Sequence, residues 1–185
     1  MEFSLFATPI GTCAIAWGPA GIRALLLPEP TEEETRARLL RRLPQARPTA
    51  PPPAIQALID DIVALLHGES RNLQQAVLDL NGIPDFERRV YAVTRDIAPG
   101  NTRSYGEIAA LCGDRQAARA VGQALASNPF PIIVPCHRVL AAAGRSGGFS
   151  APGGTLTKLR LLQLEGWPRQ GACSEAAPGN LTLPF

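Results

Sequence analysis

The residues of this sequence best suited to covalent chemistry are the adjacent Cys136 and His137 of the segment Pro135-Cys136-His137-Arg138-Val139. A thiolate is a strong nucleophile, but a free cysteine near neutral pH is only a few per cent ionised. A catalytic cysteine therefore needs a base, and the base needs a group that orients it. Adjacency alone does not bring Cys136 against His137, because neighbouring side chains on a strand point to opposite faces.

The sequence offers little for the other common roles of cysteine. Its four cysteines form no CxxC pair, so we expect neither a disulfide framework nor a structural zinc site. Only two histidines, His67 and His137, are available as ligands. We interpret Cys13, Cys112 and Cys173 as small core or surface residues, and we expect no metal and no organic cofactor.

Residues 128–139 carry a longer pattern, Asn-Pro-x-Pro-x-x-x-Pro-Cys-His-Arg-Val. With its flanks, from Phe86 to Gly166, it resembles the O6-alkylguanine-DNA alkyltransferase family, also called methylated-DNA–protein-cysteine methyltransferases. The resemblance is faint over residues 1–82. It implies direct-reversal DNA repair, in which the alkyl group of O6-alkylguanine moves irreversibly onto Cys136, once per molecule, after minor-groove binding and rotation of the base out of the duplex.

The same resemblance implies catalytic roles for Cys136, His137, Glu165 and Asn128. His137 would take the proton of Cys136 through a bridging water, Glu165 would hold the imidazole, and Asn128 would brace the turn carrying the cysteine. From the residues alone, Asn128 is also suited to cap the preceding helix, and both roles can hold. Only the match to Lys-x-x-Leu-Leu-x-x-Glu-Gly distinguishes Glu165 from a solvated carboxylate at a helix end.

DNA binding is expected from a helix over residues 115–127. Its small side chains suit close approach to sugars in the minor groove, whereas a helix reading major-groove edges would carry Arg, Asn or Gln along its outer face. The resemblance implies that Arg119 fills the gap left by the rotated nucleotide and that Tyr105 crowds its phosphate. Without the resemblance, Arg119 would be interpreted as an ordinary surface arginine and Tyr105 as a residue that anchors the core. The expected DNA-binding residues are Arg119, Tyr105, Ala117, Ala118, Gly122 and Arg138.

The lesion pocket is expected around Gly147-Gly148-Phe149-Ser150. Many family members have tyrosine where this chain has Phe149, which supplies an apolar wall but no proton. Backbone N–H groups near Ser150 can donate to guanine O6 in the manner of an oxyanion hole. The following segment, 151–154, is longer than in some members. The expected pocket residues are Pro131, Val139, Gly147, Gly148, Phe149 and Ser150.

Three other functions explain part of the sequence. An alkyltransferase-like protein that flags lesions without repairing them has another residue, commonly tryptophan, in place of the cysteine, so Cys136 argues against it. A winged-helix transcription factor leaves the Pro-Cys-His-Arg-Val motif without a purpose. A cysteine hydrolase lacks a motif around a distant histidine, for which His67 is the only other candidate.

Composition and charge are consistent with a DNA-binding protein. Hydrophobic residues make up 45% of the 185 residues, and no apolar run approaches the ~20 residues that cross a bilayer. Residues 1–82 carry 7 Arg against 9 acidic residues, whereas residues 83–168 carry 10 Lys and Arg against 6. The start lacks a secretory signal. We expect a cytoplasmic monomer that binds double-stranded DNA containing O6-alkylguanine, without a membrane or an obligate protein partner.

Alternation and turn residues predict a small α/β domain over residues 1–82, which the resemblance implies is ribonuclease-H-like. Thr31 and Glu34 form the pattern of a capping box. The expected elements are strands at Phe3–Ala7, Cys13–Trp17, Ile22–Leu27 and Leu78–Leu80, helices after Thr31 and at Ala54–Leu66, and an extended Pro44–Pro53.

Helical spacing dominates residues 83–170, the expected alkyltransferase domain of winged helix-turn-helix type. Ser104 and Glu107 again form a capping box, and the turn at Gly113-Asp114 fits either a helix-turn-helix or an ordinary αα-hairpin. Residues 171–185 are expected to be a loosely packed tail. The other expected elements are helices at Pro84–Ile97, Tyr105–Leu111 and Arg115–Ser127, and a strand at Pro131–Val134.

Overall fold

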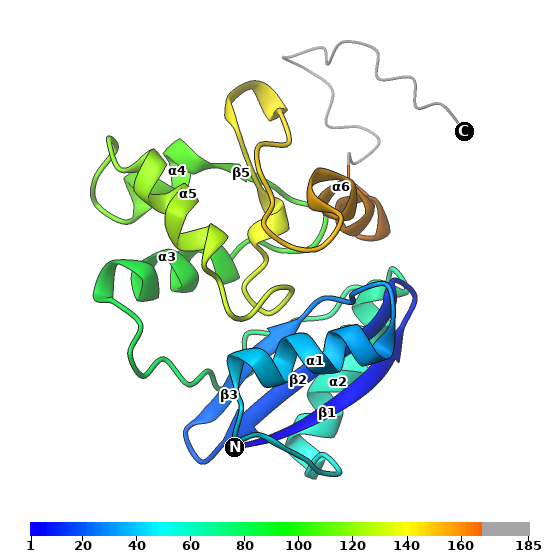
Figure 1. Cartoon of the computed structure of the whole chain (residues 1–185). Coiled ribbons are helices and arrows are strands. Elements are labelled where there is room, and N and C mark those ends of the chain that lie inside the picture. The colour runs from blue at the N-terminus through cyan, green and yellow to red at the C-terminus, as the bar shows by residue number, and fades with distance from the viewer. Residues whose placement is uncertain (168–185) are drawn as a thin grey trace.

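The computed structural model describes residues 1–167 of a mixed α/β protein (Figure 1). Its first half contains a four-stranded sheet of order β3-β2-β1-β4, in which only the β1–β4 pair is parallel. The hairpin and third strand predicted from alternation are confirmed. The strands are β1 (Glu2–Thr8), β2 (Gly11–Gly18), β3 (Gly21–Leu26) and β4 (Arg47–Pro48).

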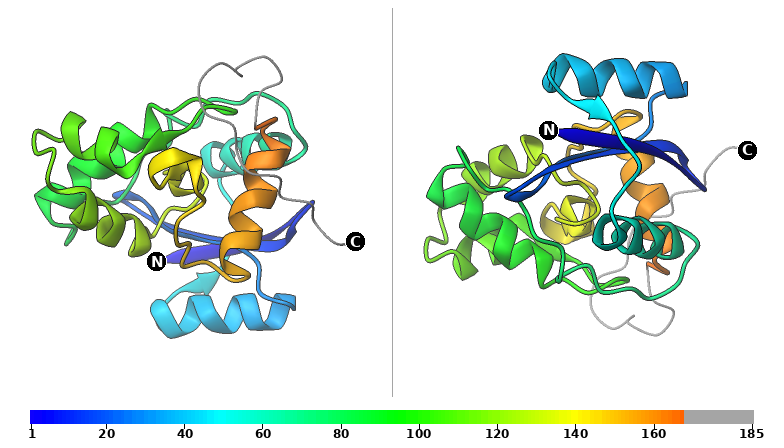
Figure 2. Two further views of the ribbon diagram at one scale, coloured as in Figure 1. Left: turned by 90° about the horizontal axis from the view of Figure 1, so that it is seen from above. Right: turned by 90° about the horizontal axis from the view of Figure 1, so that it is seen from below.

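The alternation along β2 divides its side chains between two layers. Ala14 and Ala16 face α1 (Glu32–Arg42), whereas Ile15 and Trp17 belong to the larger core that includes α2 (Pro53–Leu66). Figure 2 shows α1 and α2 on opposite sides of the sheet. Because successive strand residues point to opposite faces, the small residues admit one helix closely while the large ones build the main core.

The second half is mainly helical and carries a two-stranded parallel ladder (Figure 1). The ladder places the start of α4 beside the end of the short 3-10 turn Cys136–Arg138, since Arg103 and Ser104 pair with Val139 and Leu140. The remaining elements are α3 (Asp85–Arg95), β5 (Arg103–Ser104), α4 (Tyr105–Leu111), α5 (Ala118–Ala126), β6 (Val139–Leu140), a 3-10 turn at Ala142–Gly144, and α6 (Gly154–Leu164).

Both predicted capping boxes are confirmed. The Thr31 hydroxyl accepts from the Glu34 N–H while the Glu34 carboxylate accepts from the Thr31 N–H. Ser104 and Glu107 make the same reciprocal pair at the start of α4. At each helix start, two N–H groups that would otherwise lack an acceptor are hydrogen-bonded. In the second box this fixes the start of α4 at Tyr105.

Three predicted elements differ from the structure. Helix α5 begins at Ala118 instead of Arg115, because Asp114 accepts from the Gln116 and Ala117 N–H groups and holds a turn there. Residues 131–134 form a tight turn and not a strand: Ile132 has a φ of 72° and the Val134 N–H donates to the Phe130 carbonyl.

The third difference is at Leu78–Leu80, where only a single bridge joins Ile22 to Leu78. The Ile22 N–H donates to Val77 and the Asp79 N–H to Ile22, after which the chain turns away. The expected tail, residues 171–185, lies outside the described part of the chain, as does Cys173.

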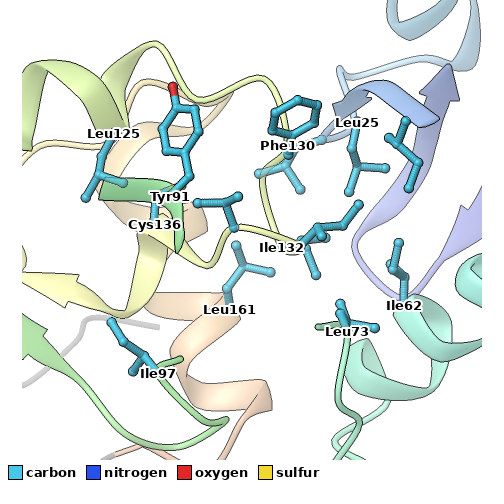
Figure 3. Packing of buried hydrophobic residues seen from close by; sticks show 14 of the residues in the cluster. Leu25, Ile62, Leu73, Tyr91, Ile97, Leu125, Phe130, Ile132, Cys136 and Leu161 are labelled. Carbon is cyan, nitrogen blue, oxygen red and sulfur yellow. The ribbon is translucent and has the colours of Figure 1, made fainter. Parts of the chain in front are cut away.

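One hydrophobic core runs through both halves (Figure 3). Leu25 and Ile62 from the first half share it with Tyr91, Phe130 and Cys136 from the second. Within residues 1–167, no helix is long and apolar enough to cross a membrane. Cys136 therefore lies in a core to which both halves of the described chain contribute.

Tyr91 ties α3 to α5 inside this core. Its hydroxyl donates to the Ala124 carbonyl at 3.0 Å, and its ring packs edge-to-face on Phe130. Tyr91→Phe leaves the ring in place but removes a buried hydrogen bond, so we expect the free energy of unfolding to fall by about 1 kcal/mol. Urea unfolding monitored by circular dichroism measures this change; an unchanged midpoint and slope would contradict it.

Candidate active site

Cys136 begins the 3-10 turn Cys136–Arg138, and Asn128 holds that turn in place. The Asn128 amide nitrogen donates to the Val134 carbonyl at 3.0 Å and lies 3.4 Å from the Cys136 sulfur. Its amide oxygen accepts from the Phe130 N–H at 2.9 Å. One side chain thus fixes both the backbone before the cysteine and the sulfur itself.

His137 and Arg138 share the carboxylate of Glu165, which lies directly after α6. His137 Nε2 lies 2.9 Å from Glu165 Oε1, and Arg138 donates to both carboxylate oxygens at 2.7 Å. Arg138 also donates to the Ile97 carbonyl. The side chains of His137 and Glu165 are only 1% and 4% exposed, so this network is closed to solvent.

The network determines which nitrogen of His137 can accept a proton. Burial lowers the pKa of His137 below its ordinary value, although Glu165 opposes the shift, so the imidazole is neutral near pH 7. With a proton on Nε2 directed at Glu165, Nδ1 is the acceptor nitrogen. Nδ1 is buried and has no hydrogen-bond partner in the described part of the chain. It is therefore free to act as a base.

Cys136 itself is 7% exposed, and burial raises the pKa of its thiol. The hydrogen bond from Asn128 and the charge of Lys158 lower it only in part. This environment does not favour a resting thiolate. Desolvation favours the neutral thiol, so ionisation has to accompany proton removal by a base.

Lys158 is a functional candidate that the sequence analysis missed. Its side chain is fully buried, its ammonium donates to the Val139 carbonyl at 2.6 Å, and it lies 5.7 Å from the centre of the Tyr105 ring. Burial lowers the pKa of Lys158 to about 8, with Cys136 opposing the shift. The sequence does contain a signal for this residue. Lys158 lies on the same face of α6 as the buried Leu161 and Leu162, and a lysine without an acidic partner is unusual on a buried face.

A cavity of about 770 Å³ opens beside Cys136, within the range of roughly 300–1,000 Å³ typical of small-molecule sites. Its walls come from α4, α5 and the segment before α6. The lining residues are Ser104, Tyr105, Gly106, Ala118, Arg119, Gly122, Leu125, Ala126, Cys136, Ala141, Ala142, Gly148, Phe149 and Ser150.

The structure brings together most, but not all, of the residues singled out from the sequence. Of the expected pocket residues, Gly148, Phe149 and Ser150 line the cavity; Val139 is fully buried, and Pro131 lines a second cavity. Gly147 does not line the main cavity, although a side chain added there would approach the Tyr105 ring.

Of the residues expected to contact DNA, some line the main cavity and others do not. Arg119 is exposed at the cavity, where Tyr105, Ala118 and Gly122 also lie, whereas Ala117 is outside its lining. The expectation that Arg138 contacts DNA conflicts with the structure, because that side chain is buried and held by Glu165 and Ile97. Arg138 instead neutralises the carboxylate that orients His137.

Comparison with known proteins identifies relatives of the whole chain. Residues 85–167 match the family model described as 6-O-methylguanine DNA methyltransferase, DNA binding domain. A methylated-DNA–protein-cysteine methyltransferase of Mycobacterium bovis is 38% identical over 99% of this chain and 98% of its own length. A protein of the same name from Methanothermobacter thermautotrophicus is 34% identical over 88% of this chain and 84% of its own length. A crystal structure of Mycobacterium tuberculosis OGT in complex with DNA superposes with a TM-score of 0.72 at 36% identity, covering 89% of this chain and 92% of that one.

The buried carboxylate makes stability depend on pH in a defined direction. Burial alone would raise the pKa of Glu165, but His137 and Arg138 outweigh it and lower the pKa from 4.5 to about 2. A depressed folded pKa stabilises the folded protein above about pH 4.5, and this contribution is lost as the pH falls through 2.

We therefore expect the unfolding free energy of the wild type to exceed that of Glu165→Gln by a pH-dependent amount on the order of 3 kcal/mol at pH 7. This amount should shrink steadily below pH 4.5. Urea unfolding of both proteins between pH 2.5 and 7 measures it. A difference that is constant over this range would show that the carboxylate is not held as the network implies.

Proposed function

This chain belongs to the methylated-DNA–protein-cysteine methyltransferases, and from that membership we propose that it repairs O6-alkylguanine in double-stranded DNA by moving the alkyl group onto its own Cys136. One observation carries the proposal. Cys136 lines a cavity large enough for a small ligand while its neighbour His137 offers a buried, unpartnered Nδ1. A nucleophile beside room for a substrate is thus followed directly in the chain by a candidate base.

The transfer is a displacement in which the thiolate of Cys136 attacks the alkyl carbon bonded to guanine O6. The carbon–oxygen bond breaks, its electron pair remains on the guanine, and a sulfur–carbon bond forms. The thiol proton passes to Nδ1 of His137 through a water molecule and finally replaces the alkyl group on guanine. The thioether has no easy reversal, so each chain acts once and no cofactor is consumed.

Groups around the cavity suit the departing guanine. Burial raises the pKa of Tyr105, so its phenol keeps its proton and can donate to the extruded base. The backbone N–H of Ser150 has no acceptor among the described residues and can stabilise negative charge on O6. Phe149 supplies an apolar wall without a proton. The developing charge on guanine is therefore met by Tyr105 and the backbone.

Helix α5 is the proposed contact with the minor groove. Arg119 projects from it at the cavity mouth, and Gly122 packs against the Tyr105 ring, where an added Cβ would lie 3.8 Å from ring carbon. Small residues bring the helix close to the sugar walls, and Arg119 fills the space that the rotated nucleotide leaves. Flipping costs a few kcal/mol, least for a weakened pair such as one with alkylated guanine.

We also propose a finer description of the two halves. Residues 1–82 form a ribonuclease-H-like domain, and residues 83–170 a winged helix-turn-helix-like domain in which α4 and α5 are the helix pair. The parallel β5–β6 ladder, close to the cysteine turn, supports the second assignment. We propose further that the protein acts as a monomer in the cytoplasm.

The central test is transfer to the sulfur. Incubation with an oligonucleotide carrying O6-methylguanine should add the mass of one methyl group, located by mass spectrometry on the peptide that contains Cys136. Cys136→Ala should abolish transfer completely because no other thiol among residues 1–167 lines the cavity, yet it should bind the same oligonucleotide. Unchanged mass of the wild type together with tight binding would instead favour a protein that only flags the lesion.

A second test concerns Arg119. Arg119→Ala should slow transfer by roughly tenfold or more, because the flipped state loses the side chain that replaces the nucleotide in the stack. Arg115→Ala is the matched control, since Arg115 is exposed just before α5 and does not line the cavity. Single-turnover rates on the same duplex compare the two; full-speed repair by Arg119→Ala contradicts the assignment.

A further inference from the structure

A second cavity of about 370 Å³ also borders Cys136 and lies between the two halves of the chain. Its walls come from the end of β3, from α1, from the end of α5 and from the segment before α6. We call it the side chamber. Its lining residues are Leu25, Leu26, Leu27, Arg38, Arg42, Leu125, Ala126, Ser127, Asn128, Pro131, Cys136, Phe149, Ser150, Ala151 and Pro152.

The side chamber and the main cavity share a common partition. Five residues line both cavities. Two of these five are joined by a hydrogen bond of 2.8 Å, which the Ser150 hydroxyl donates to the Ala126 carbonyl. The shared residues are Leu125, Ala126, Cys136, Phe149 and Ser150. Cys136 is the one cysteine among them, so the same residue borders both the space for the base and a further, adjoining space.

The geometry of the displacement requires such a space for any group larger than methyl. Sulfur, the attacked carbon and guanine O6 must align for the bond exchange. The rest of an alkyl chain then has to leave that line sideways. With the base in the main cavity, the side chamber is the adjoining volume that can receive it.

The outer wall of the side chamber is firmly held. Thr157 donates to the Pro152 carbonyl at 2.6 Å and ties the segment to α6. Gly153 has a φ of 78°, and a Cβ there would lie 2.3 Å from the Thr157 hydroxyl, so the bend depends on glycine. On the facing side, the Leu25 N–H donates to the Pro129 carbonyl. The chamber is thus built by fixed backbone.

Positive charge gathers at the mouth of the side chamber. Arg38 is paired with Glu29 at 2.9 Å, but Arg42 has no ion pair or hydrogen bond within residues 1–167. Burial lowers the pKa of Arg42, and the nearby charges of Arg23 and Arg38 lower it further. An anion at this position would relieve that repulsion, whereas a second cation would add to it.

We propose that the side chamber receives O6-alkyl chains longer than methyl and favours those that end in a carboxylate over those that end in an ammonium group. This specificity rests on the proposed function, because Cys136 must be the alkyl acceptor. Apolar Leu25 and Pro131 contact the methylene groups, and Arg42 binds the terminal carboxylate. The transferred chain stays in the chamber as the thioether on Cys136.

The test uses four duplexes that differ only in the O6 group of one guanine: methyl, n-butyl, 3-carboxypropyl and 3-aminopropyl. Single-turnover rates are measured by mass spectrometry of the Cys136 peptide for the wild type, Arg42→Gln, Arg42→Glu and Ala151→Leu. Arg41→Gln is the matched control, because Arg41 is exposed on the same helix and does not line the chamber.

For the wild type we expect carboxypropyl transfer to be faster than aminopropyl transfer. Arg42→Gln should reduce that ratio by up to about fivefold, the size expected of a partly exposed ion pair. Arg42→Glu should invert the preference. Ala151→Leu should slow all three longer groups by roughly tenfold or more, as for an added obstacle in a close-fitting pocket. Methyl transfer should be unchanged in every variant.

The controls separate the two proposals. If the wild type transfers no methyl group, the repair function fails and the chamber assignment falls with it. If methyl transfer proceeds but the carboxypropyl-to-aminopropyl ratio is the same in the wild type, Arg42→Gln and Arg41→Gln, only the chamber assignment is overturned. Equal slowing of all four groups by Arg42→Gln would also overturn it, because Arg42 would then act on folding or DNA binding instead.

Discussion

The arrangement of the site depends on the buried carboxylate of Glu165, which binds two side chains: the cationic Arg138 and the polar imidazole of His137. Glu165 is compensated by Arg138, so its negative charge does not force a proton onto His137. The imidazole remains neutral, and its hydrogen bond to Glu165 leaves the opposite nitrogen as the acceptor. Burial lowers the pKa of His137, Glu165 raises it, and the charge of Arg138 lowers it further, so Arg138 works with burial to keep the imidazole neutral.

This network explains why so much of the chain is needed to build a site with few reacting atoms. Glu165 comes from the end of α6, Arg138 also binds the Ile97 carbonyl after α3, and Asn128 after α5 holds the cysteine turn. The sheet of the first half packs into the same core and hydrogen-bonds to the loop that follows Asn128. Displacement of any of these elements would move the sulfur relative to its base.

The sequence predicted features that depend on neighbouring residues and failed where distant contacts decide. Thr31 and Ser104 were correctly predicted as helix caps, because a capping box is complete within four residues. Residues 131–134 were expected to be a strand from their apolar character, but Ile132 adopts a left-handed conformation inside a turn that Asn128 holds from outside. Local propensity does not encode that contact.

The side chains of the site show the same limit. The motif indicated Cys136, His137 and Glu165, yet the adjacent Arg138 was expected to contact DNA. Only the tertiary structure shows that Arg138 turns inward to Glu165. Lys158 was not singled out, although its spacing from the buried Leu161 and Leu162 places it on the core face of α6.

Burial of Cys136 also fits a site that works once. The resting thiol and the final thioether are both neutral, so a desolvated environment suits the two long-lived states. Only the thiolate is disfavoured, and in the proposed transfer it forms only while His137 holds the proton and the substrate fills the cavity. An enzyme that turns over must regenerate its nucleophile and tolerate water during that step. The proposed single transfer ends at a thioether and has no such step, so it is compatible with a sulfur in a packed core, on a residue that is 7% exposed.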